Sequence, residues 1–186
     1  MYKKALSLRD SGHYADAAKL YRIIAKRQEG QETDDGESLS AWAEASARTC
    51  ECLGRRLNHT TEADGDLFVR KIKDIVTVRK SADALSALLS CDVVIGNWGS
   101  EFGPPEGPEI VAKRLIPGLS KVTKSARLSH KMLIGIVESI SSAITVFEAQ
   151  KDKLGWLVHA IIHGESADFD VIVAQDLRGA KSVKEP

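Results

Sequence analysis

The sequence of 186 residues predicts an all-α protein, and three observations lead to that prediction. Apolar residues recur at three- and four-residue steps along most segments, which is the spacing of one helix face. Glycines stand where such segments end, as at Gly12 and Gly54. The segment from Ser120 to Asp152 keeps the same spacing over about 30 residues, which would make roughly 45 Å of helix. We therefore expect about six to eight helices, first as hairpins and then as a helical bundle with one long helix.

Residues 8–25 read as the end of one helix, a turn at Gly12, and a second helix that folds back on the first. Glycine accepts a positive φ without a Cβ clash, so it is favoured where the first helix stops. Before the turn, Ala5 and Leu8 give a short helix an apolar face. After the turn, small alanines alternate with larger side chains on one face: Tyr14, Ala17, Ala18, Tyr21 and Ile24.

The stretch with Gly12, Tyr14, Ala17 and Tyr21 resembles the second helix of the tetratricopeptide repeat. Residues 38–53 form another predicted helix, and Gly54 ends it 42 residues after Gly12. That interval exceeds the standard repeat of about 34 residues and is similar to the kinesin-light-chain type, with residues 28–37 as the polar loop. The microtubule-interacting-and-transport three-helix module contains a very similar stretch, so it is an alternative.

The resemblance covers residues 3–57, because Arg56 stands where the tyrosine of the pattern should recur. It implies stacked hairpins whose concave groove binds a peptide or helix of a partner protein. A groove of this kind gains about 25 cal/mol per Å² of apolar surface that it buries, before ordering costs.

The next segments also read as helices. Residues 66–79 carry apolar side chains mostly on a helical period, and Ser81 is a suitable N-cap for a helix that runs to Leu89. Residues 91–95 are either the last turn of that helix or a short extended piece.

Residues 96–108 contain four glycines and three prolines, so regular structure is not expected there. Trp98 and Phe102 are the apolar side chains of this loop. Either the loop pins both aromatic rings into a groove between helices, or it is an exposed peptide that a partner binds.

Pro108 suits the first turn of a helix, and the break at residues 117–118 precedes the long predicted helix of residues 120–152. The apolar stripe of that helix either packs on the N-terminal hairpins or pairs with a second copy, since its spacing is close to a heptad. Residues 153–163 predict a short apolar helix, residues 169–174 a strand or a last helical turn, and residues 179–186 a frayed tail.

The amino-acid composition restricts the classes of partner and the cellular compartment that we expect. The formal net charge is +0 and the pI is about 7.0, which argues against nucleic acid as the main partner, because phosphate binding needs a basic excess. No window of about 18 apolar residues predicts a membrane span, and no signal peptide is evident. Three cysteines without framework spacing suit a reducing compartment, so we expect a cytoplasmic protein.

One constellation raises the question of catalysis. His159 and His163 are four residues apart on a predicted helix, where two imidazoles can chelate a metal ion. The zinc-peptidase pattern needs Glu after the first His, and Ala160 stands there. No third ligand follows from the spacing, although His130, Glu138 or Glu148 could come near by folding. Phosphate-loop, dinucleotide and nucleophile-elbow motifs are missing from the sequence. We therefore predict no enzyme, no metal and no cofactor.

The predicted organisation is hairpins over residues 1–95, the loop of 96–108, helices over 109–178 packed on the first part, and a tail at 179–186. The predicted function is a protein-binding scaffold or adaptor, with Trp98, Phe102, Trp42 and Glu44 as candidate partner-binding residues. The alternatives are a self-assembling homodimer through the long helix, and a metal-dependent hydrolase that uses His159 and His163.

Overall fold

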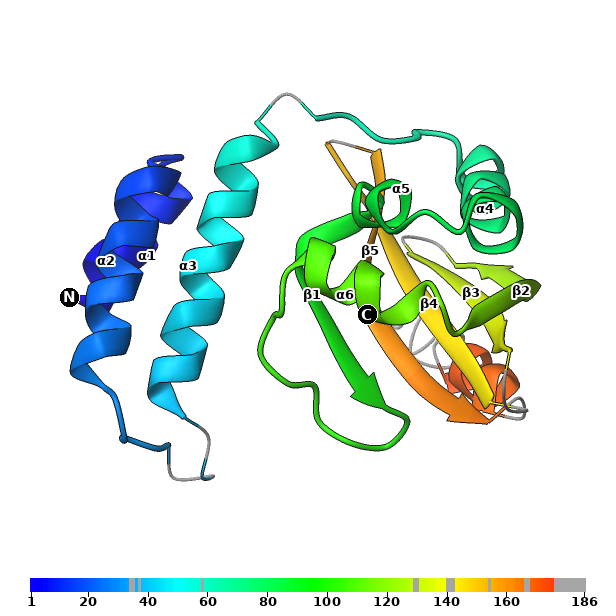
Figure 1. Cartoon of the computed structure of the whole chain (residues 1–186). Coiled ribbons are helices and arrows are strands. Elements are labelled where there is room, and N and C mark those ends of the chain that lie inside the picture. Colours follow the sequence, from blue (N-terminus) through cyan, green and yellow to red (C-terminus); the bar gives the residue numbers. More distant parts are fainter. Residues whose placement is uncertain are drawn as a thin grey trace, which may run out of the picture. The chain divides into compact units, whose positions relative to one another are not determined.

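The chain forms two compact units in the computed structural model, which describes residues 1–33, 36, 38–57, 59–128, 131–139, 143–153, 155–165 and 168–175. Unit 1 comprises Met1–His59 and Pro104–Gly107. Unit 2 comprises Thr60–Gly103 and Pro108–Pro186. Unit 1 is helical, whereas unit 2 combines helices with a sheet (Figure 1).

Unit 1 contains helices α1 (Tyr2–Asp10), α2 (Tyr14–Arg27) and α3 (Leu39–Arg55). Gly12 has a φ of 81° in the turn between α1 and α2, which explains why glycine stands there. The Ser38 hydroxyl accepts a hydrogen bond from the amide of Ala41 and caps α3. The buried cluster of this unit combines small residues with one large ring: Ala5, Ala17, Ala18, Tyr21, Ile24, Ala25, Ala43, Ala47 and Cys50.

The predicted tetratricopeptide resemblance is wrong. Within the described part of the chain, residues 59–64 after α3 are neither helix nor strand, and no second hairpin follows them. The next elements belong to unit 2 and lead into a sheet. The local pattern around Gly12 therefore describes one pair of helices and not a member of a helical repeat.

Unit 2 begins with α4 (Gly65–Asp74), the π-helix η1 (Ile75–Arg79) and the short helix α5 (Ala82–Ser86). The Asp64 carboxylate caps α4 by accepting from the amides of Asp66 and Leu67, each at 2.9 Å. The predicted helix of residues 66–79 is confirmed in α4 and η1. Ser81 is the N-cap of α5 as predicted, but α5 is much shorter than expected.

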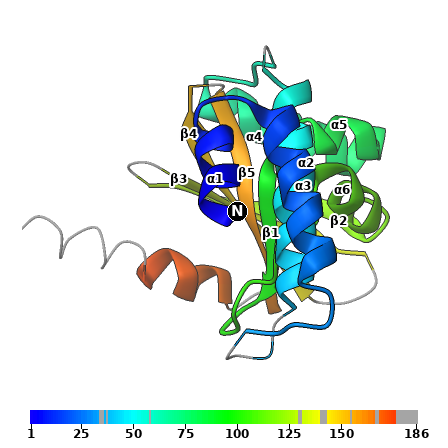
Figure 2. The same ribbon diagram turned by 90° about the vertical axis from the view of Figure 1, so that its left-hand side faces the viewer.

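Five strands follow, with one helix among them: β1 (Leu89–Asn97), α6 (Pro108–Leu115), β2 (Leu119–Arg127), β3 (Lys131–Glu138), β4 (Ala143–Asp152) and β5 (Gly155–Glu165). Their order in the sheet is β1-β5-β4-β3-β2. β1 runs parallel to β5, and the other neighbours are antiparallel. Residues 168–175 form a further helix, which Figure 2 shows near the end of β5.

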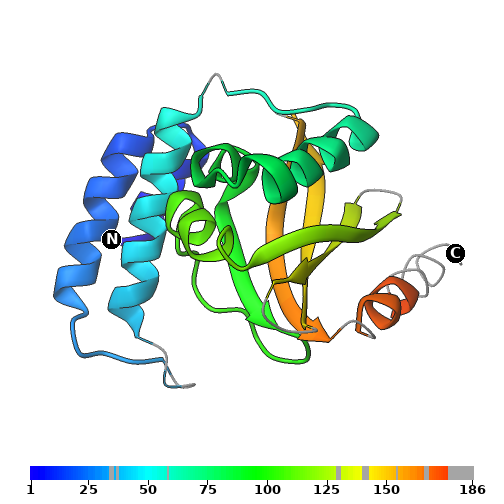
Figure 3. The ribbon, with the colours of Figure 1, turned by 45° about the vertical axis from the view of Figure 1, so that its right-hand side comes forward.

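Both faces of the sheet are covered. On one face the strands pack against α4, η1, α5 and α6 in a cluster that includes Phe68, Ile72, Ile134, Phe147 and Trp156, and Figure 3 shows these helices on one side of the strands. On the opposite face a second cluster contains Leu133, Ile144, Val146, Ile162, Phe169 and Ile172, so the helix of residues 168–175 contributes the last two.

The predicted all-α fold with one long helix is therefore wrong. Residues 120–152 form β2, β3 and β4, and residues 155–163 belong to β5. A strand that is buried on both faces has a continuous apolar sequence. Such a sequence also contains apolar residues at three- and four-residue steps, as a helix face does. Residues 91–95 lie in β1, and residues 169–174 lie in the last helix. The predicted tail of residues 179–186 lies outside the described residues.

In the part of the chain that the structure describes, no helix combines the length and the hydropathy of a membrane span.

Candidate functional site: a histidine and a glutamate beside a small pocket

The candidate site of unit 2 lies where three neighbouring strands approach the same end of the sheet. Glu138 is the last residue of β3, Thr145 lies near the start of β4, and His163 lies near the end of β5. Thr145 is paired with both Ile136 and His163 in the sheet register. Residues two apart on a strand lie on the same face of the sheet. Glu138, Thr145 and His163 therefore lie on the face whose next residues, Ile136, Phe147 and Ile161, pack in the helix-covered core.

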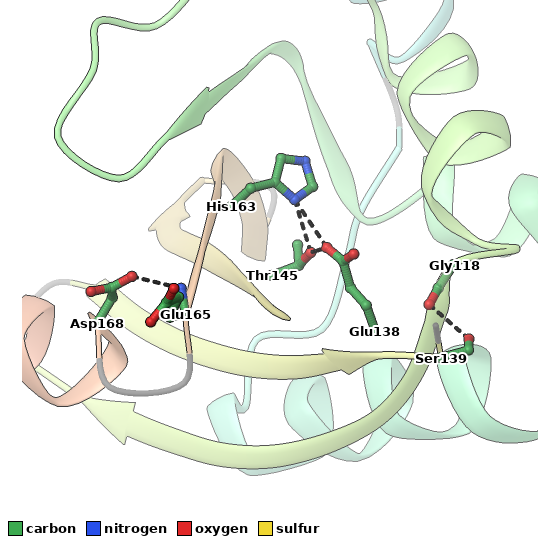
Figure 4. Close-up of polar contacts among 7 residues, drawn as sticks. All are labelled: Gly118, Glu138, Ser139, Thr145, His163, Glu165 and Asp168. Atoms are coloured by element: carbon green, nitrogen blue, oxygen red, sulfur yellow. Dashed lines mark hydrogen bonds and ion pairs between the residues drawn. The ribbon is translucent and has the colours of Figure 1, made fainter. Parts of the chain in front are cut away.

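The three side chains form a closed hydrogen-bonded triangle (Figure 4). The Thr145 hydroxyl donates to Glu138 Oε1 at 2.7 Å, and His163 Nδ1 lies 3.2 Å from the same oxygen. Nδ1 is also 3.1 Å from the Thr145 oxygen. Thr145 is fully buried, whereas about a third of the His163 and Glu138 side chains remains exposed, at 31% and 29%. The triangle is thus fixed on its inner side and open on its outer side.

These contacts determine which ring nitrogen of His163 carries the proton. A carboxylate has no proton to donate, and the Thr145 hydroxyl already donates its own to Glu138. Nδ1 must therefore be the N–H donor, shared between Glu138 Oε1 and the Thr145 oxygen. In the neutral ring, Nε2 then carries the lone pair, and Figure 4 shows it pointing away from both partners. The arrangement presents a hydrogen-bond acceptor, or a base, on the open side.

A pocket of about 230 Å³ lies beside the triangle. Its lining combines the two titratable residues of the triangle with residues at the end of α6 and the start of β2: Arg114, Leu115, Gly118, Leu119, Glu138 and His163. Two of these lining residues, Leu115 and Leu119, are apolar and buried. Typical sites for drug-sized molecules span about 300–1,000 Å³, so this pocket suits a smaller ligand.

Two backbone contacts fix the surroundings of the site. The carbonyl of Gly118 accepts from both the amide and the hydroxyl of Ser139, at 2.7 and 2.8 Å, which ties the turn before β2 to the end of β3. Asp168 Oδ2 accepts from the amide of Glu165 at 2.6 Å, just beyond His163 on β5 (Figure 4). The strand ends that carry Glu138 and His163 are therefore held from both sides.

A second polar cluster includes His159, which lies four residues before His163 on β5. The Ser90 hydroxyl donates to Asp92 Oδ1 on β1, and His159 Nδ1 on β5 lies 3.5 Å from that oxygen. The contact with His159 lowers the pKa of Asp92 from 3.8 to about 2, and the contact with Asp92 raises the pKa of His159 above 6.5. The register between β4 and β5 shifts at Glu148/Ala149, so His159 is the extra residue of a β-bulge.

The predicted pairing of His159 with His163 on a helix is wrong, because both residues lie on β5 and have different carboxylate partners. Of the residues considered as nearby ligands, Glu138 does lie beside His163, Glu148 pairs with Lys131 at 3.3 Å, and His130 lies outside the described residues. Among the described residues, no group of three or more His, Cys, Asp or Glu side chains is placed to hold a metal ion.

The candidate partner-binding residues have separate locations. Trp98 is partly buried against the second sheet cluster, and its amide donates to the His163 carbonyl at 2.8 Å. Phe102 is 40% exposed and its ring lies close to Gly96, where a Cβ would be 2.9 Å from Cδ1. Trp42 and Glu44 lie on α3 in unit 1, and Glu44 pairs with Arg22 at 3.5 Å. Trp98 and Phe102 therefore belong to unit 2, whereas Trp42 and Glu44 belong to unit 1.

Sequence reasoning missed Thr145. Thr145 stands in an alternating Ile144-Thr145-Val146 run, and a β-branched polar residue among β-branched apolar residues is typical of a strand. That signal could have placed Thr145 on a strand, but its pairing with His163 depends on the sheet register.

No protein-family model matches the chain, and no curated protein matches it either. Solved structures do match. A domain of unknown function with a cystatin-like fold from Nostoc punctiforme PCC 73102 is 16% identical, covers 67% of this chain and 96% of its own, and has a TM-score of 0.40. An NTF2-like protein of unknown function from Shewanella baltica OS155 is 12% identical, covers 53% and 88%, and has a TM-score of 0.36.

A DUF4783 family protein from Bacteroides ovatus ATCC 8483 is 12% identical, covers 51% of this chain and 92% of its own, and has a TM-score of 0.41. The structures from Nostoc punctiforme and Shewanella baltica are described as a cystatin-like fold and as an NTF2-like protein. At these identities and TM-scores, no function is transferred from them.

Proposed function

We propose that unit 2 is a small-molecule-binding domain, and that its ligand donates a hydrogen bond to His163 Nε2. The observation that carries this proposal is the triangle of Glu138, Thr145 and His163, which fixes the imidazole of His163 beside a pocket of about 230 Å³. Such an arrangement costs folding free energy unless every buried polar group has a hydrogen-bond partner.

The pocket has the composition of a binding site on a small scale. Concave sites usually combine apolar walls with a few polar groups that fix the orientation of the ligand. Here Leu115 and Leu119 are the apolar lining residues, and Arg114, Glu138 and His163 are the polar ones. The helix α6 and the strand ends that carry these residues are regular elements, which hold a site more firmly than loops do.

The adaptor function predicted from the sequence stays a prediction, as does the absence of catalysis. The helices of unit 1 do not form a repeat array, so the concave groove on which the adaptor prediction depended has no counterpart in the described part of unit 1. The triangle beside the pocket is the better-supported basis for a function.

The test is a binding screen of small polar molecules by ¹H–¹⁵N NMR on the full chain. We expect binders to shift the amides of Leu115, Gly118 and Leu119. The variant His163→Asn should abolish these shifts, because the Asn amide can still donate to Glu138 while the acceptor at the Nε2 position is gone. The matched control is His159→Asn, which changes the other histidine of β5 and should leave the shifts intact.

Binding that persists in His163→Asn, or a screen in which no molecule shifts the pocket amides, would contradict the proposal. The thermal unfolding midpoints of both variants are to be measured as a control. Midpoints close to that of the parent protein would show that each comparison is made on folded protein.

A further inference from the structure

The strand β2 lies at one edge of the sheet of unit 2 (Figure 1). It pairs with β3 on one side, and an edge strand leaves every second backbone N–H and C=O group without a partner in the sheet. Within the part of the chain that the structure describes, one further hydrogen bond reaches its backbone, from Lys80 Nζ to the carbonyl of Leu119. Beyond Leu119, the outer edge of β2 is therefore open to an added strand.

The same strand is basic, although the formal net charge of the chain is +0. It contains Lys121, Lys124 and Arg127 and no acidic residue. Lys121 is exposed and has no ion-pair partner among the described residues. Lys124 Nζ lies 2.8 Å from Asp170 Oδ2, but the Asp170 side chain is 71% exposed, and exposed ion pairs contribute little to stability. Both lysines can therefore pair with carboxylates of a partner.

A β-bulge places these two lysines on one face of the sheet. Val122 and Lys124 pair with consecutive residues of β3, so Thr123 is an extra residue between them. On a regular strand, residues three apart lie on opposite faces. The extra residue instead brings Lys121 and Lys124 to the same face, where Lys124 Nζ lies 5.6 Å from the centre of the Phe169 ring. The edge thus offers two positive charges in one row.

These features together select the chemistry of the added strand. A second copy of β2 would bring the same three cations beside these ones, and like charges on neighbouring strands are destabilising. A nucleic acid would match the charge but has no row of peptide N–H and C=O groups to pair with the edge. An extended acidic peptide provides both, because its backbone continues the ladder and its alternate side chains lie on one face.

We propose that β2 binds an extended acidic segment of a partner protein as an added strand. The backbone of the segment pairs with the outer edge of β2, and carboxylates at alternate positions lie beside Lys121 and Lys124. On the other face, the guanidinium of Arg127 lies 5.9 Å from the centre of the Trp156 ring and plays a smaller part. Residues 120–127 include none of the residues that line the described pocket, so the inference goes beyond the proposed function and does not depend on it.

The test is a titration of the full chain with a blocked peptide in which glutamate and valine alternate, followed by ¹H–¹⁵N NMR. We expect the amides of β2 to shift, with intermolecular nuclear Overhauser contacts between the peptide and the β2 backbone. The same peptide with alternate amides N-methylated keeps its charges but loses backbone donors, so it should bind at least about tenfold more weakly. A peptide with glutamine in place of glutamate should bind about three- to tenfold more weakly.

A substitution in β2 tests the charge from the side of the protein. Lys121→Gln removes one charge from the open edge and should weaken binding of the acidic peptide about two- to fivefold, with a smaller effect at high salt. The matched control is Lys113→Gln on α6, an exposed lysine outside the sheet, which should leave the affinity unchanged. The thermal midpoints of both variants are to be compared with that of the parent protein.

Unshifted β2 amides at millimolar peptide, or equal binding of the N-methylated peptide, would overturn the proposal. Equal effects of Lys121→Gln and Lys113→Gln would overturn it as well. If the β2 amides shift with protein concentration alone, a second copy occupies the edge and the proposed acidic partner is wrong. Binding that requires the backbone donors of the peptide and weakens specifically in Lys121→Gln would support the proposal.

Discussion

The two units build their interiors from different side chains. The cluster of unit 1 consists mostly of alanines, with Tyr21 as its large ring, and small residues let helices approach closely. The main cluster of unit 2 consists mostly of branched aliphatic residues with Phe68, Phe147 and Trp156. Burial of a large apolar side chain stabilises a fold by about 1.5–3 kcal/mol, and alanine contributes much less. Unit 2 therefore depends on many large contacts, and unit 1 depends on few.

The position of the candidate site follows from this difference. Unit 2 has a sheet buried on both faces, and its rows of large side chains end in Glu138, Thr145 and His163. Polar groups at the end of a rigid apolar core are held in place by their neighbours, which is what a binding site needs. The buried cluster of unit 1, by contrast, consists of small residues around Tyr21.

The largest expected effect is at Phe147, a fully buried residue of β4 in the centre of the main cluster. Phe147→Ala should lower the free energy of unfolding by about 3–5 kcal/mol, because it removes a large side chain and leaves a cavity. Chemical denaturation followed by far-ultraviolet circular dichroism measures this loss. Phe102→Ala, at a ring that is 40% exposed, is the control and should cost far less. Equal losses would contradict the described core.

The next effect is at Gly135 on β3, which faces the helix of residues 168–175. A Cβ at Gly135 would lie 2.8 Å from Ile144 Cδ1 and 3.0 Å from Phe169 Cδ2, closer than such atoms normally approach. Gly135→Ala should cost about 1–3 kcal/mol of stability through overpacking. Adding Phe169→Leu should recover part of the loss, since the shorter side chain makes room. A double variant less stable than the sum of both single changes would show that the helix does not dock there.

A smaller effect concerns the pH dependence of Asp92 and His159. The pKa of Asp92 is lowered to about 2, so its contribution to stability is present above 3.8 and lost as the pH falls. The pKa of His159 is raised, so its contribution is present below 6.5 and lost as the pH rises through the folded-state value. Both contributions are complete between about pH 4 and 6.5.

The stability difference between the parent and Asp92→Asn should therefore be largest near about pH 5 and should shrink on both sides. The Asp92 side chain is 58% exposed, and the buried Nε2 of His159 has no hydrogen-bond partner within the described residues, so we expect less than about 1 kcal/mol. Thermal unfolding at a series of pH values measures the profile. A difference that does not vary with pH would contradict the ion pair.

The smallest expected effect is removal of the Tyr21 hydroxyl in unit 1. Tyr21 is fully buried, and within the described part of the chain its hydroxyl has no hydrogen-bond partner. Tyr21→Phe should therefore be neutral or stabilising by up to about 1 kcal/mol, because an unpaired buried hydroxyl is removed. Tyr21→Ala should instead cost about 3 kcal/mol or more, because it empties the centre of the cluster. A costly Tyr21→Phe, measured by denaturation, would reveal a partner for the hydroxyl.

The sequence could predict the helices of unit 1 because each buries one face. Ala17, Ala18, Tyr21 and Ile24 keep the helical period, and exposed residues separate them. The strands β3 and β4 bury both faces, so Met132 to Ile136 reads as a continuous apolar run, and only Thr145 interrupts the run from Ile144 to Phe147. The β-branched residues of these segments favoured strands, but the prediction followed the three- and four-residue spacing instead.

The candidate site was predictable only in part. His163 was singled out, and Glu138 was considered as a residue that folding could bring near it. Their partnership depends on the pairing of β3 with β4 and of β4 with β5, which is set by the register of three strands. No local spacing encodes that register, so neither Thr145 nor the pocket at the end of α6 could be found before the sheet was known.

The measurement that tests the account most directly is the tautomer of His163. Long-range ¹H–¹⁵N correlation spectra of ¹⁵N-histidine-labelled protein distinguish the two neutral forms of each imidazole. We expect His163 to carry its proton on Nδ1, donated to Glu138, and to keep Nε2 as an acceptor that points away from Glu138 and Thr145. In Glu138→Ala this preference should disappear. A proton on Nε2 in the parent protein would contradict the triangle and the acceptor on which the proposed function depends.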